Sequence, residues 1–172
     1  VVVELATGVA GPYAGKLFAD FGADVIKVEP EGGDPARSEG VRSGARPGPE
    51  RSPLFLHVNR NKRSIELADG ESELLRSLIA GADLVLESDG AGGLGRFGQT
   101  VQALRADRPD LVVTSVTPFG RSGPYTELGA GELATYAMAG PMHATGMPDR
   151  EPLKLAGNIL QYQCGSLAAV AS

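Results

Sequence analysis

The sequence has no tryptophan, few aromatic residues and a single cysteine. Phe and Tyr make up 5% of its 172 residues, so the stacking platform of a single-strand nucleic-acid binder is not expected. Cys164 has no second cysteine with which to form an internal disulfide, and this favours a cytoplasmic location over a secreted one. The net charge of −5 argues against general nucleic-acid binding. Any anion site should therefore be local.

Long apolar runs and metal-ligand patterns are also missing. No apolar stretch approaches the ~20 residues needed to span a bilayer, and no signal peptide is recognisable, so we expect no membrane association. No cluster of His, Cys and Asp has metal-ligand spacing, so we expect no metal site. The chain is 42% hydrophobic and 22% charged, which is typical of a globular domain. It starts on a strand and stops inside an apolar helical pattern, which indicates a fragment of something longer.

The most informative stretch is the basic run at residues 59–63, where Arg60, Lys62 and Arg63 lie within four residues and Asn59 adds a neutral donor. An alternating strand follows it. Cations at the mouth of a sheet suit a phosphate-bearing ligand, because charge-assisted bonds to phosphate oxygens are strong. The alternative is a solvated turn that happens to be basic, as most charge runs are. A second arginine-rich stretch, residues 31–53, is either a flexible loop or a phosphate clamp.

Apolar strand-like runs alternate with helix-like periodicity along the chain. We expect strands at residues 1–5, 24–28, 54–58, 64–67, 83–86 and 111–116. We expect helices over residues 14–21, 74–79, 101–104 and 132–139, and from about residue 161 onward. Asp69 is expected to cap the second of these helices. The alternation predicts a one-domain α/β fold with a mainly parallel sheet, whose ligand site lies at the carboxyl ends of the strands, such as the loop at 87–95.

Four blocks of the sequence resemble the class III (CaiB/BaiF) CoA-transferases, which include formyl-CoA and carnitine CoA-transferases and α-methylacyl-CoA racemase. The blocks are VELATGVAGPYAGKLFADFGADVIKVEP, NRNKRSIEL, ADLVLE with GGLGRFG, and FGRSGPY, and they appear in the family's order over nearly the whole chain. The resemblance implies a Rossmann-like fold in which residues 1–172 are a large-domain segment without the distal small domain. It also implies an interlocked homodimer or a fusion with a second transferase half.

The resemblance further implies a coenzyme A site on this segment, with CoA as substrate. The positions that match the family's CoA site, together with the basic run, are Ala10, Asn59, Arg60, Lys62, Arg63, Leu67, Ala68, Asp69, Gly70, Ser88, Asp89, Gly90 and Arg96. Asp89 departs from the family pattern, and its charge would repel a phosphate unless the side chain points away.

The family's catalytic position carries an unexpected residue. Class III transferases use an aspartate carboxylate that attacks the acyl-CoA thioester to form a mixed anhydride, with a glycine four residues further on. Counting back four residues from Gly165 gives Gln161, whose amide cannot form that anhydride. The racemase branch has a His-Asp step where this chain has Gly131-Glu132, so its histidine base is also missing.

These departures leave several functions open. The chain is either a CoA-transferase segment with a modified reaction, a catalytically silent CoA- or nucleotide-binding module, the degenerate half of a fused transferase, or an acyl-CoA racemase-like enzyme. Cys164 is a candidate for a replacement nucleophile, because a helix start lowers a thiol pKa. It is a weaker candidate, since a small buried thiol in a helix is common. Glu132 is expected to be the first-turn acid of its helix, and His57 and His143 are expected to be structural or surface residues.

Overall fold

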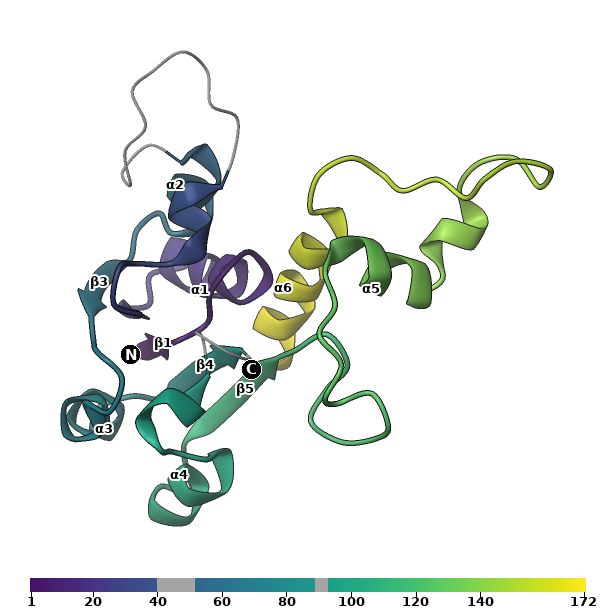
Figure 1. Cartoon of the computed structure of the whole chain (residues 1–172). Helices are drawn as coiled ribbons and strands as arrows, with labels where there is room; N and C mark the ends of the chain where they lie inside the picture. Colours follow the sequence, from purple (N-terminus) through teal and green to yellow (C-terminus); the bar gives the residue numbers. More distant parts are fainter. Residues whose placement is uncertain (40–51, 89–92) are drawn as a thin grey trace.

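The computed structural model describes residues 1–39, 52–88 and 93–172. These residues form a five-stranded sheet in the order β3-β2-β1-β4-β5, and every neighbouring pair of strands is parallel (Figure 1). The strands are β1 (Val2–Glu4), β2 (Val25–Glu29), β3 (Arg63–Glu66), β4 (Leu84–Ser88) and β5 (Val112–Val116). The predicted α/β fold with a parallel sheet is confirmed.

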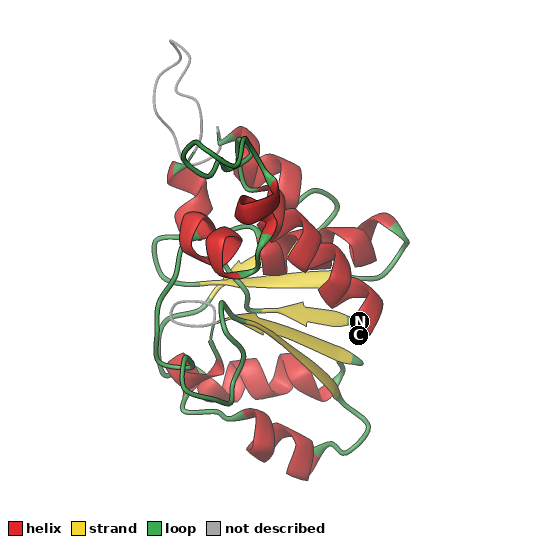
Figure 2. Ribbon diagram, turned by 90° about the vertical axis from the view of Figure 1, so that its right-hand side faces the viewer, coloured by secondary structure: helices red, strands yellow, loops and turns green. Residues whose placement is uncertain are grey.

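Helices cover both faces of the sheet (Figure 2). The α-helices are α1 (Ala10–Asp20), α2 (Pro53–Val58), α3 (Ser72–Ala80), α4 (Val101–Asp107), α5 (Glu132–Met138) and α6 (Ile159–Ala171). Short 3₁₀ turns are η1 (Pro35–Ser38), η3 (Leu94–Phe97) and η4 (Pro141–Ala144). Helical crossovers of this kind keep neighbouring strands parallel and bury both faces of the sheet.

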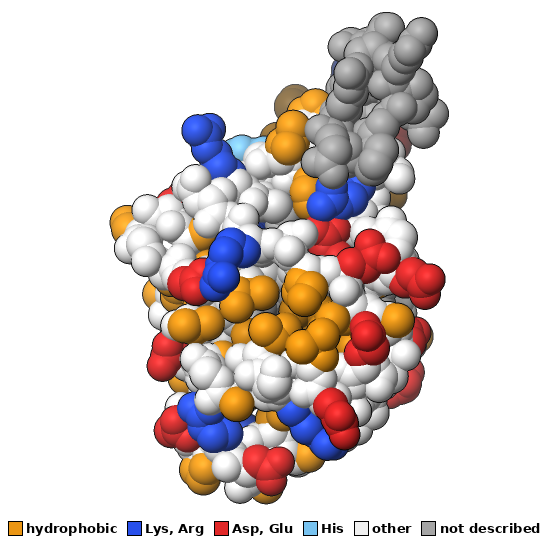
Figure 3. Space-filling model, turned by 90° about the vertical axis from the view of Figure 1, so that its left-hand side faces the viewer, with side chains coloured by type: hydrophobic (Ala, Val, Ile, Leu, Met, Phe, Trp, Pro, Cys, Tyr) orange, Lys and Arg blue, Asp and Glu red, His pale blue; other side chains and the backbone are white. Residues whose placement is uncertain are grey.

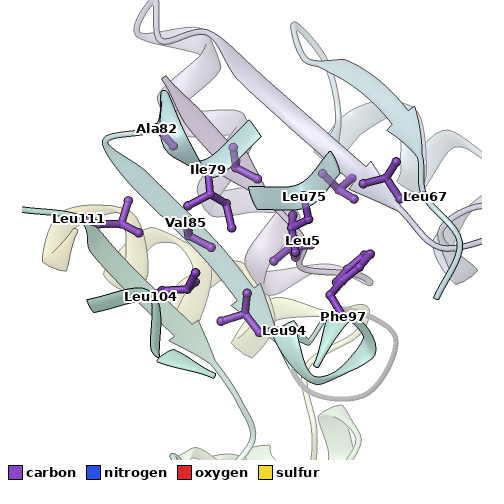
Figure 4. Packing of buried hydrophobic residues seen from close by; sticks show 12 residues of the cluster. Leu5, Leu67, Leu75, Ile79, Ala82, Val85, Leu94, Phe97, Leu104 and Leu111 are labelled. Atoms are coloured by element: carbon purple, nitrogen blue, oxygen red, sulfur yellow. The ribbon is translucent and has the colours of Figure 1, made fainter. Parts of the chain in front are cut away.

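The core lies in two layers, one on each face of the sheet. On one face, side chains from the strands pack against α3, η3 and α4, and Figure 4 shows Leu5, Val85, Leu75, Phe97 and Leu104 converging there. On the other face, Val2, Val25 and Leu86 pack with Ala14 of α1 and with Ala168 and Ala169 of α6. Because successive strand residues point to opposite faces, Val2 and Val3 belong to different layers.

Two sequence predictions are wrong. Residues 54–58 are not a strand but lie in α2, where the Ser52 hydroxyl accepts a hydrogen bond from Phe55 N and Pro53 occupies the first turn. A Ser-Pro start of this kind favours a helix, and it outweighed the apolar run that follows. Asp69 does not cap α3, which has Glu71 at its N-cap position. The Asp69 carboxylate instead pairs with Arg96.

The remaining helices and strands lie where the periodicity placed them, within a few residues at their ends. Among the described residues, no helix is long and apolar enough to cross a membrane. Within the same residues, no group of three or more His, Cys, Asp or Glu side chains is arranged to hold a metal ion.

Candidate functional site

The order of the strands points to the site. The chain leaves β1 toward β2 and β3 on one side, and β4 and β5 lie on the other side. In open α/β sheets, ligands bind outside the carboxyl ends of the strands where this order reverses. Here that point lies between the turn after β1 and the end of β4. Thr7 N in the turn donates a hydrogen bond to Ser88 Oγ at 3.3 Å, which ties the two strand ends together.

A cavity of about 440 Å³ opens at this point. It is bounded by the β1–α1 turn, the ends of β4 and β5, and the helices α5 and α6. Most of its lining is apolar, and its polar side chains include those of Thr7, Ser88, Glu132 and Gln161. A mostly apolar hollow with a few convergent polar groups is typical of a small-molecule site. The structure therefore brings three of the predicted site residues, Ala10, Ser88 and Gln161, to one cavity.

Helix α6 presents its first turn to this cavity. Its backbone N–H groups are held by the carboxylate of Glu132: Leu160 N donates to Oε1 at 3.0 Å and Gln161 N donates to Oε2 at 3.3 Å. Lys154 Nζ lies 3.7 Å from Glu132 Oε1, and the Glu132 side chain is 10% exposed. A carboxylate at this end of a helix neutralises the unsatisfied N–H groups and the positive end of the dipole.

This cap is a functional contact that the sequence reading missed. Glu132 does lie in the first turn of α5, as predicted, but its carboxylate serves a helix 28 residues further along the chain. No local pattern reports such a contact. On its other side α6 lies close to α1 at Gly165. The approach is so close that a Cβ at Gly165 would overlap the carbonyl oxygen of Ala10.

Cys164 lines the same cavity, one helical turn beyond Leu160. The expectation of a lowered thiol pKa is wrong. Partial burial and the nearby Glu132 carboxylate raise the pKa of Cys164 above its ordinary value. Burial, the larger cause, disfavours the charged thiolate, and the negative charge capping α6 adds to the effect by opposing the helix dipole. The thiol is therefore protonated at neutral pH and is a weak nucleophile.

A second cavity, of about 620 Å³, lies on the other side of the end of β4. Ser88 lines both cavities, and Arg96 and Arg121 line this one. Arg96 donates to Leu67 O at 2.8 Å and pairs with Asp69 at 2.8 Å, and its own carbonyl accepts from Gly70 N at 3.2 Å. The structure thus brings Arg96 and the predicted segment Leu67, Ala68, Asp69 and Gly70 together.

The basic run does not form one charged patch. Lys62 has 1% of its side chain exposed and pairs with Glu4 Oε2 at 2.7 Å. Arg63 is exposed and pairs with Asp24 at the amino ends of the strands, and Arg60 lies on the surface. Asn59 closes α2, with its amide donating to Phe55 O. The prediction that Lys62 meets a phosphate conflicts with its burial. The face seen from the β3 side also mixes cations with acids (Figure 3).

The other candidates from the sequence can be placed or set aside. Asp89, Gly90, Arg42, Arg46 and Arg51 lie outside the described residues. Arg37 stacks on Phe55 and pairs with Glu29 at 2.7 Å. Burial alone would raise the pKa of Glu29, but hydrogen bonds from Arg37 and from Asp34 N lower it to about 2. His57 lies against Tyr13 and Tyr162, and His143 is exposed in η4.

Comparison with known proteins agrees with this geometry. The model of the family described as CoA-transferase family III matches residues 1–172. The succinate–glutarate CoA-transferase of Agrobacterium fabrum is 43% identical over 162 residues, which cover 89% of this chain and 40% of that protein. Subunit BbsE of the succinyl-CoA:(R)-benzylsuccinate CoA-transferase of Thauera aromatica is 38% identical over 174 residues, which cover 99% of this chain and 42% of that protein.

A solved structure shows the same fold. The crystal structure of a CAIB/BAIF family protein from Brucella suis superposes with a TM-score of 0.84 and is 39% identical, covering 99% of this chain and 46% of that one. The chain spans less than half the length of the relatives it matches. Because the family match extends over all 172 residues, it covers every element described above. This chain belongs to CoA-transferase family III.

Proposed function

We propose that this chain is the large-domain, CoA-binding segment of a cytoplasmic enzyme that transfers CoA between an acyl-CoA and a carboxylic acid. The observation that carries the proposal is the 440 Å³ cavity at the strand-order reversal, which Ala10, Ser88 and Gln161 all line. The relatives from Agrobacterium fabrum and Thauera aromatica, named as CoA-transferases of dicarboxylic acids, support the reaction class.

The proposed CoA site has two parts, joined at Ser88. The thioester end lies in the cavity next to the β1–α1 turn and Gln161. The nucleotide end lies toward Arg96 and residues 67–70, which the Arg96 hydrogen bonds hold together. Arg60 and Arg63 remain candidates on the surface. Arg63 is the first residue of β3, so it lies at the amino ends of the parallel strands, whereas the cavity lies at their carboxyl ends. Among the cations named by the sequence, Arg96 is the one that lines the cavity next to Ser88, and a phosphate bound there would compete with Asp69 for its guanidinium group.

The reaction itself requires a carboxylate nucleophile, and the carboxylate in this cavity is already hydrogen-bonded to α6. In the family reaction a carboxylate oxygen attacks the thioester carbonyl carbon, and CoA leaves as the thiolate. The thiolate then attacks the enzyme's carboxyl carbon in the resulting anhydride, which forms an enzyme–CoA thioester and releases the acyl group as a carboxylate. Gln161 has a neutral amide at that position. Glu132 is a carboxylate in the lining, but each of its oxygens already accepts a hydrogen bond from the start of α6. We therefore propose that this segment binds CoA without forming the acyl intermediate.

A catalytic carboxylate would then come from a second transferase half, either a partner subunit or a fused copy. The name of the Thauera aromatica relative, a subunit of a CoA-transferase, supports an assembly of unlike subunits. The interlocked homodimer implied by the family resemblance is the other arrangement, and in it both cavities would carry the amide.

Binding of CoA to the intact protein tests the first part of the proposal. Replacing Arg96 by Ala removes its charge-assisted hydrogen bonds, and we expect the affinity for CoA to fall by roughly 10- to 150-fold, the equivalent of about 1.5–3 kcal/mol. Arg105→Ala, on the exposed side of α4, is the matched control and should leave the affinity unchanged. Calorimetric titration measures both. Equal affinities for the two variants would remove Arg96 from the site, and absence of binding by the wild type would refute the proposal.

Mass spectrometry of the protein after incubation with an acyl-CoA, with hydroxylamine trapping, tests the second part. We expect no acyl adduct on the peptide that contains Gln161 and Cys164. The variant Gln161→Asp should restore weak transfer at most, because Leu160 stands where the family has glycine next to the nucleophile. A stable adduct on the wild-type peptide would instead make this segment an enzyme with a different nucleophile.

A further inference from the structure

Four charged side chains are buried together between the sheet and helix α1. Lys27 Nζ lies 3.1 Å from Glu4 Oε1 and 2.8 Å from Asp34 Oδ2, and Lys62 Nζ lies 2.7 Å from Glu4 Oε2. Each of the four side chains is at most 1% exposed. Burying ion pairs costs desolvation energy that their attraction often fails to recover, so such a cluster is weak evidence for stability alone. We therefore asked what the cluster holds in place.

The cluster contacts the turn between β1 and α1 at two points and the first turn of α1 at a third. Lys27 Nζ donates to Ala6 O at 2.9 Å, Asp34 Oδ1 accepts from Gly8 N at 3.3 Å, and Lys62 Nζ donates to Pro12 O at 2.7 Å. The backbone between these points includes Thr7 and Ala10, which line the cavity. One wall of the proposed CoA site is thus fixed by charges that do not touch the cavity.

Lys62 already has partners within the protein. Its ammonium group donates to Pro12 O and, at 2.8 Å, to Asn59 Oδ1, and it forms an ion pair with Glu4 Oε2. The side chain comes from the start of β3, so it joins the edge of the sheet to the first turn of α1. This explains how a residue in the basic run serves the site without binding phosphate.

Helix α1 is adapted to the cluster at Gly15. A Cβ at this position would overlap Glu4 Oε2 and would lie 3.3 Å from Lys62 Nζ. Any residue other than glycine would push the Glu4–Lys62 pair away from the helix. The absence of a side chain here lets the carboxylate and the ammonium group sit directly beneath α1.

We propose that Lys62 is a positioning residue for ligand binding, which holds the cavity-lining β1–α1 turn in place through Glu4 and the Pro12 carbonyl. The ligand is the CoA of the proposed function, so the binding measurement rests on that function. Hydrogen exchange of the β1–α1 turn does not depend on CoA.

The charge of Lys62 gives this role a dependence on pH. Burial lowers the pKa of Lys62, Glu4 on β1 opposes the shift and Lys27 on β2 adds to it, so that the pKa is about 8. Asp34, in the loop after β2, also favours the charged form, and Asn59 from the end of α2 is neutral. As the pH rises through about 8, Lys62 loses its proton and with it the ion pair to Glu4. The grip on the turn should weaken over the same range.

The binding experiment compares wild-type protein, Lys62→Met and Lys16→Met, all as the full-length protein. Lys16 pairs with Asp20 one turn further along α1 and forms no ion pair with any of the four buried charges. The probe is desulfo-CoA, which has no thiol to titrate. We expect about tenfold weaker binding by Lys62→Met at pH 7 and no change in Lys16→Met. From pH 7 to pH 9 the wild type should lose affinity, whereas Lys62→Met should show no such step. A purely structural role would not produce this difference between the profiles.

Hydrogen exchange supplies the positional readout. The exchange of a peptide covering residues 6–13 is divided by that of a peptide from α4, on the other face of the sheet, to remove the intrinsic effect of pH. We expect faster relative exchange in Lys62→Met and in Gly15→Ala, which keeps every charge but displaces Glu4, and no change in Lys16→Met. If Lys62→Met does not fold, Gly15→Ala and the pH series of the wild type decide the question.

Two results would overturn the positioning role. One is unchanged exchange of residues 6–13 in both Lys62→Met and Gly15→Ala, and the other is a pH step that persists in Lys62→Met. If the wild type fails to bind desulfo-CoA while the exchange of the turn still responds to Lys62, the proposed function is wrong and the grip on the turn stands.

Discussion

The two walls of the 440 Å³ cavity are built in different ways. The wall formed by the β1–α1 turn belongs to the sheet and is backed by the buried charges of Glu4, Lys27, Asp34 and Lys62. The wall formed by α5 and α6 lies outside the sheet, and its helices expose large apolar side chains: Leu133 is 60% exposed and Leu167 is 69% exposed. The charges that back the first wall all lie within this chain, whereas the second wall is held by the Glu132 cap and by the packing of α6 against α1 and the sheet through Ala168 and Ala169.

The largest expected effect concerns the apolar surface of the second wall. Val170 is 87% exposed and Met138 57% exposed, which is unusual for side chains of this size on helices. We expect the 172-residue segment on its own to self-associate, and Leu167→Asn with Val170→Asn to reduce that association. Analytical ultracentrifugation measures it. A monodisperse monomer with a cooperative thermal transition would show that the second wall is as complete as the first.

The second prediction concerns the contact between the two walls, where α6 meets α1 at Gly165. In Gly165→Val the new side chain would overlap the carbonyl oxygen of Ala10 and force α6 away from α1. Overpacking of this kind typically costs about 1–3 kcal/mol. Urea unfolding of the intact protein should show the loss, and Ala103→Val on the exposed side of α4 is the control. A free energy of unfolding equal to that of the control would mean that α6 is free to shift.

The next prediction concerns the Glu132 cap at the start of α6 in the second wall. Glu132→Ala leaves the N–H groups of Leu160 and Gln161 without their acceptor, and loss of a helix cap costs about 0.5–2 kcal/mol. Glu132→Gln keeps one acceptor oxygen but not the second acceptor or the charge, so it should lose less than Glu132→Ala. Glu151→Ala removes an exposed carboxylate and should have no effect. If the thermal midpoints of all three variants match the wild type, the cap does not hold this wall.

The smallest effect is expected beside the first wall, in acid. The pKa of Glu29 is lowered to about 2 in the folded protein by Arg37 and Asp34 N, against an ordinary value of 4.5. A carboxyl group with a lowered pKa stabilises the fold above its unfolded pKa, and that stability is lost as the pH falls from about 4.5 toward 2. Replacing Glu29 by Gln should flatten this part of the plot of unfolding free energy against pH. Urea unfolding at several pH values measures it. An unchanged slope would show that the Arg37 contact contributes nothing.

Local sequence patterns were sufficient for much of the fold. Continuous apolar runs at β1 and β4 mark buried parallel strands, since a strand covered on both faces needs apolar side chains on both. The 3.6-residue spacing of Leu75 and Ile79 marks the buried side of α3. The alternation of these patterns determined a parallel α/β sheet and, with it, a ligand site at the carboxyl ends of its strands.

Only the tertiary structure decided what the charged residues do. The polar neighbours of Lys62 in the sequence suggested a surface cation. Beneath α1, however, it pairs with Glu4 and donates a hydrogen bond to Pro12 O, both of which are 50 or more positions away. Glu132 lies in the first turn of its own helix, as the sequence predicted, but its carboxylate also caps α6, which no local pattern indicates. Burial and backbone partners are set by elements distant in sequence. A charge run therefore shows which groups are available, and the packing of α1 on the sheet determines which of them a ligand can reach.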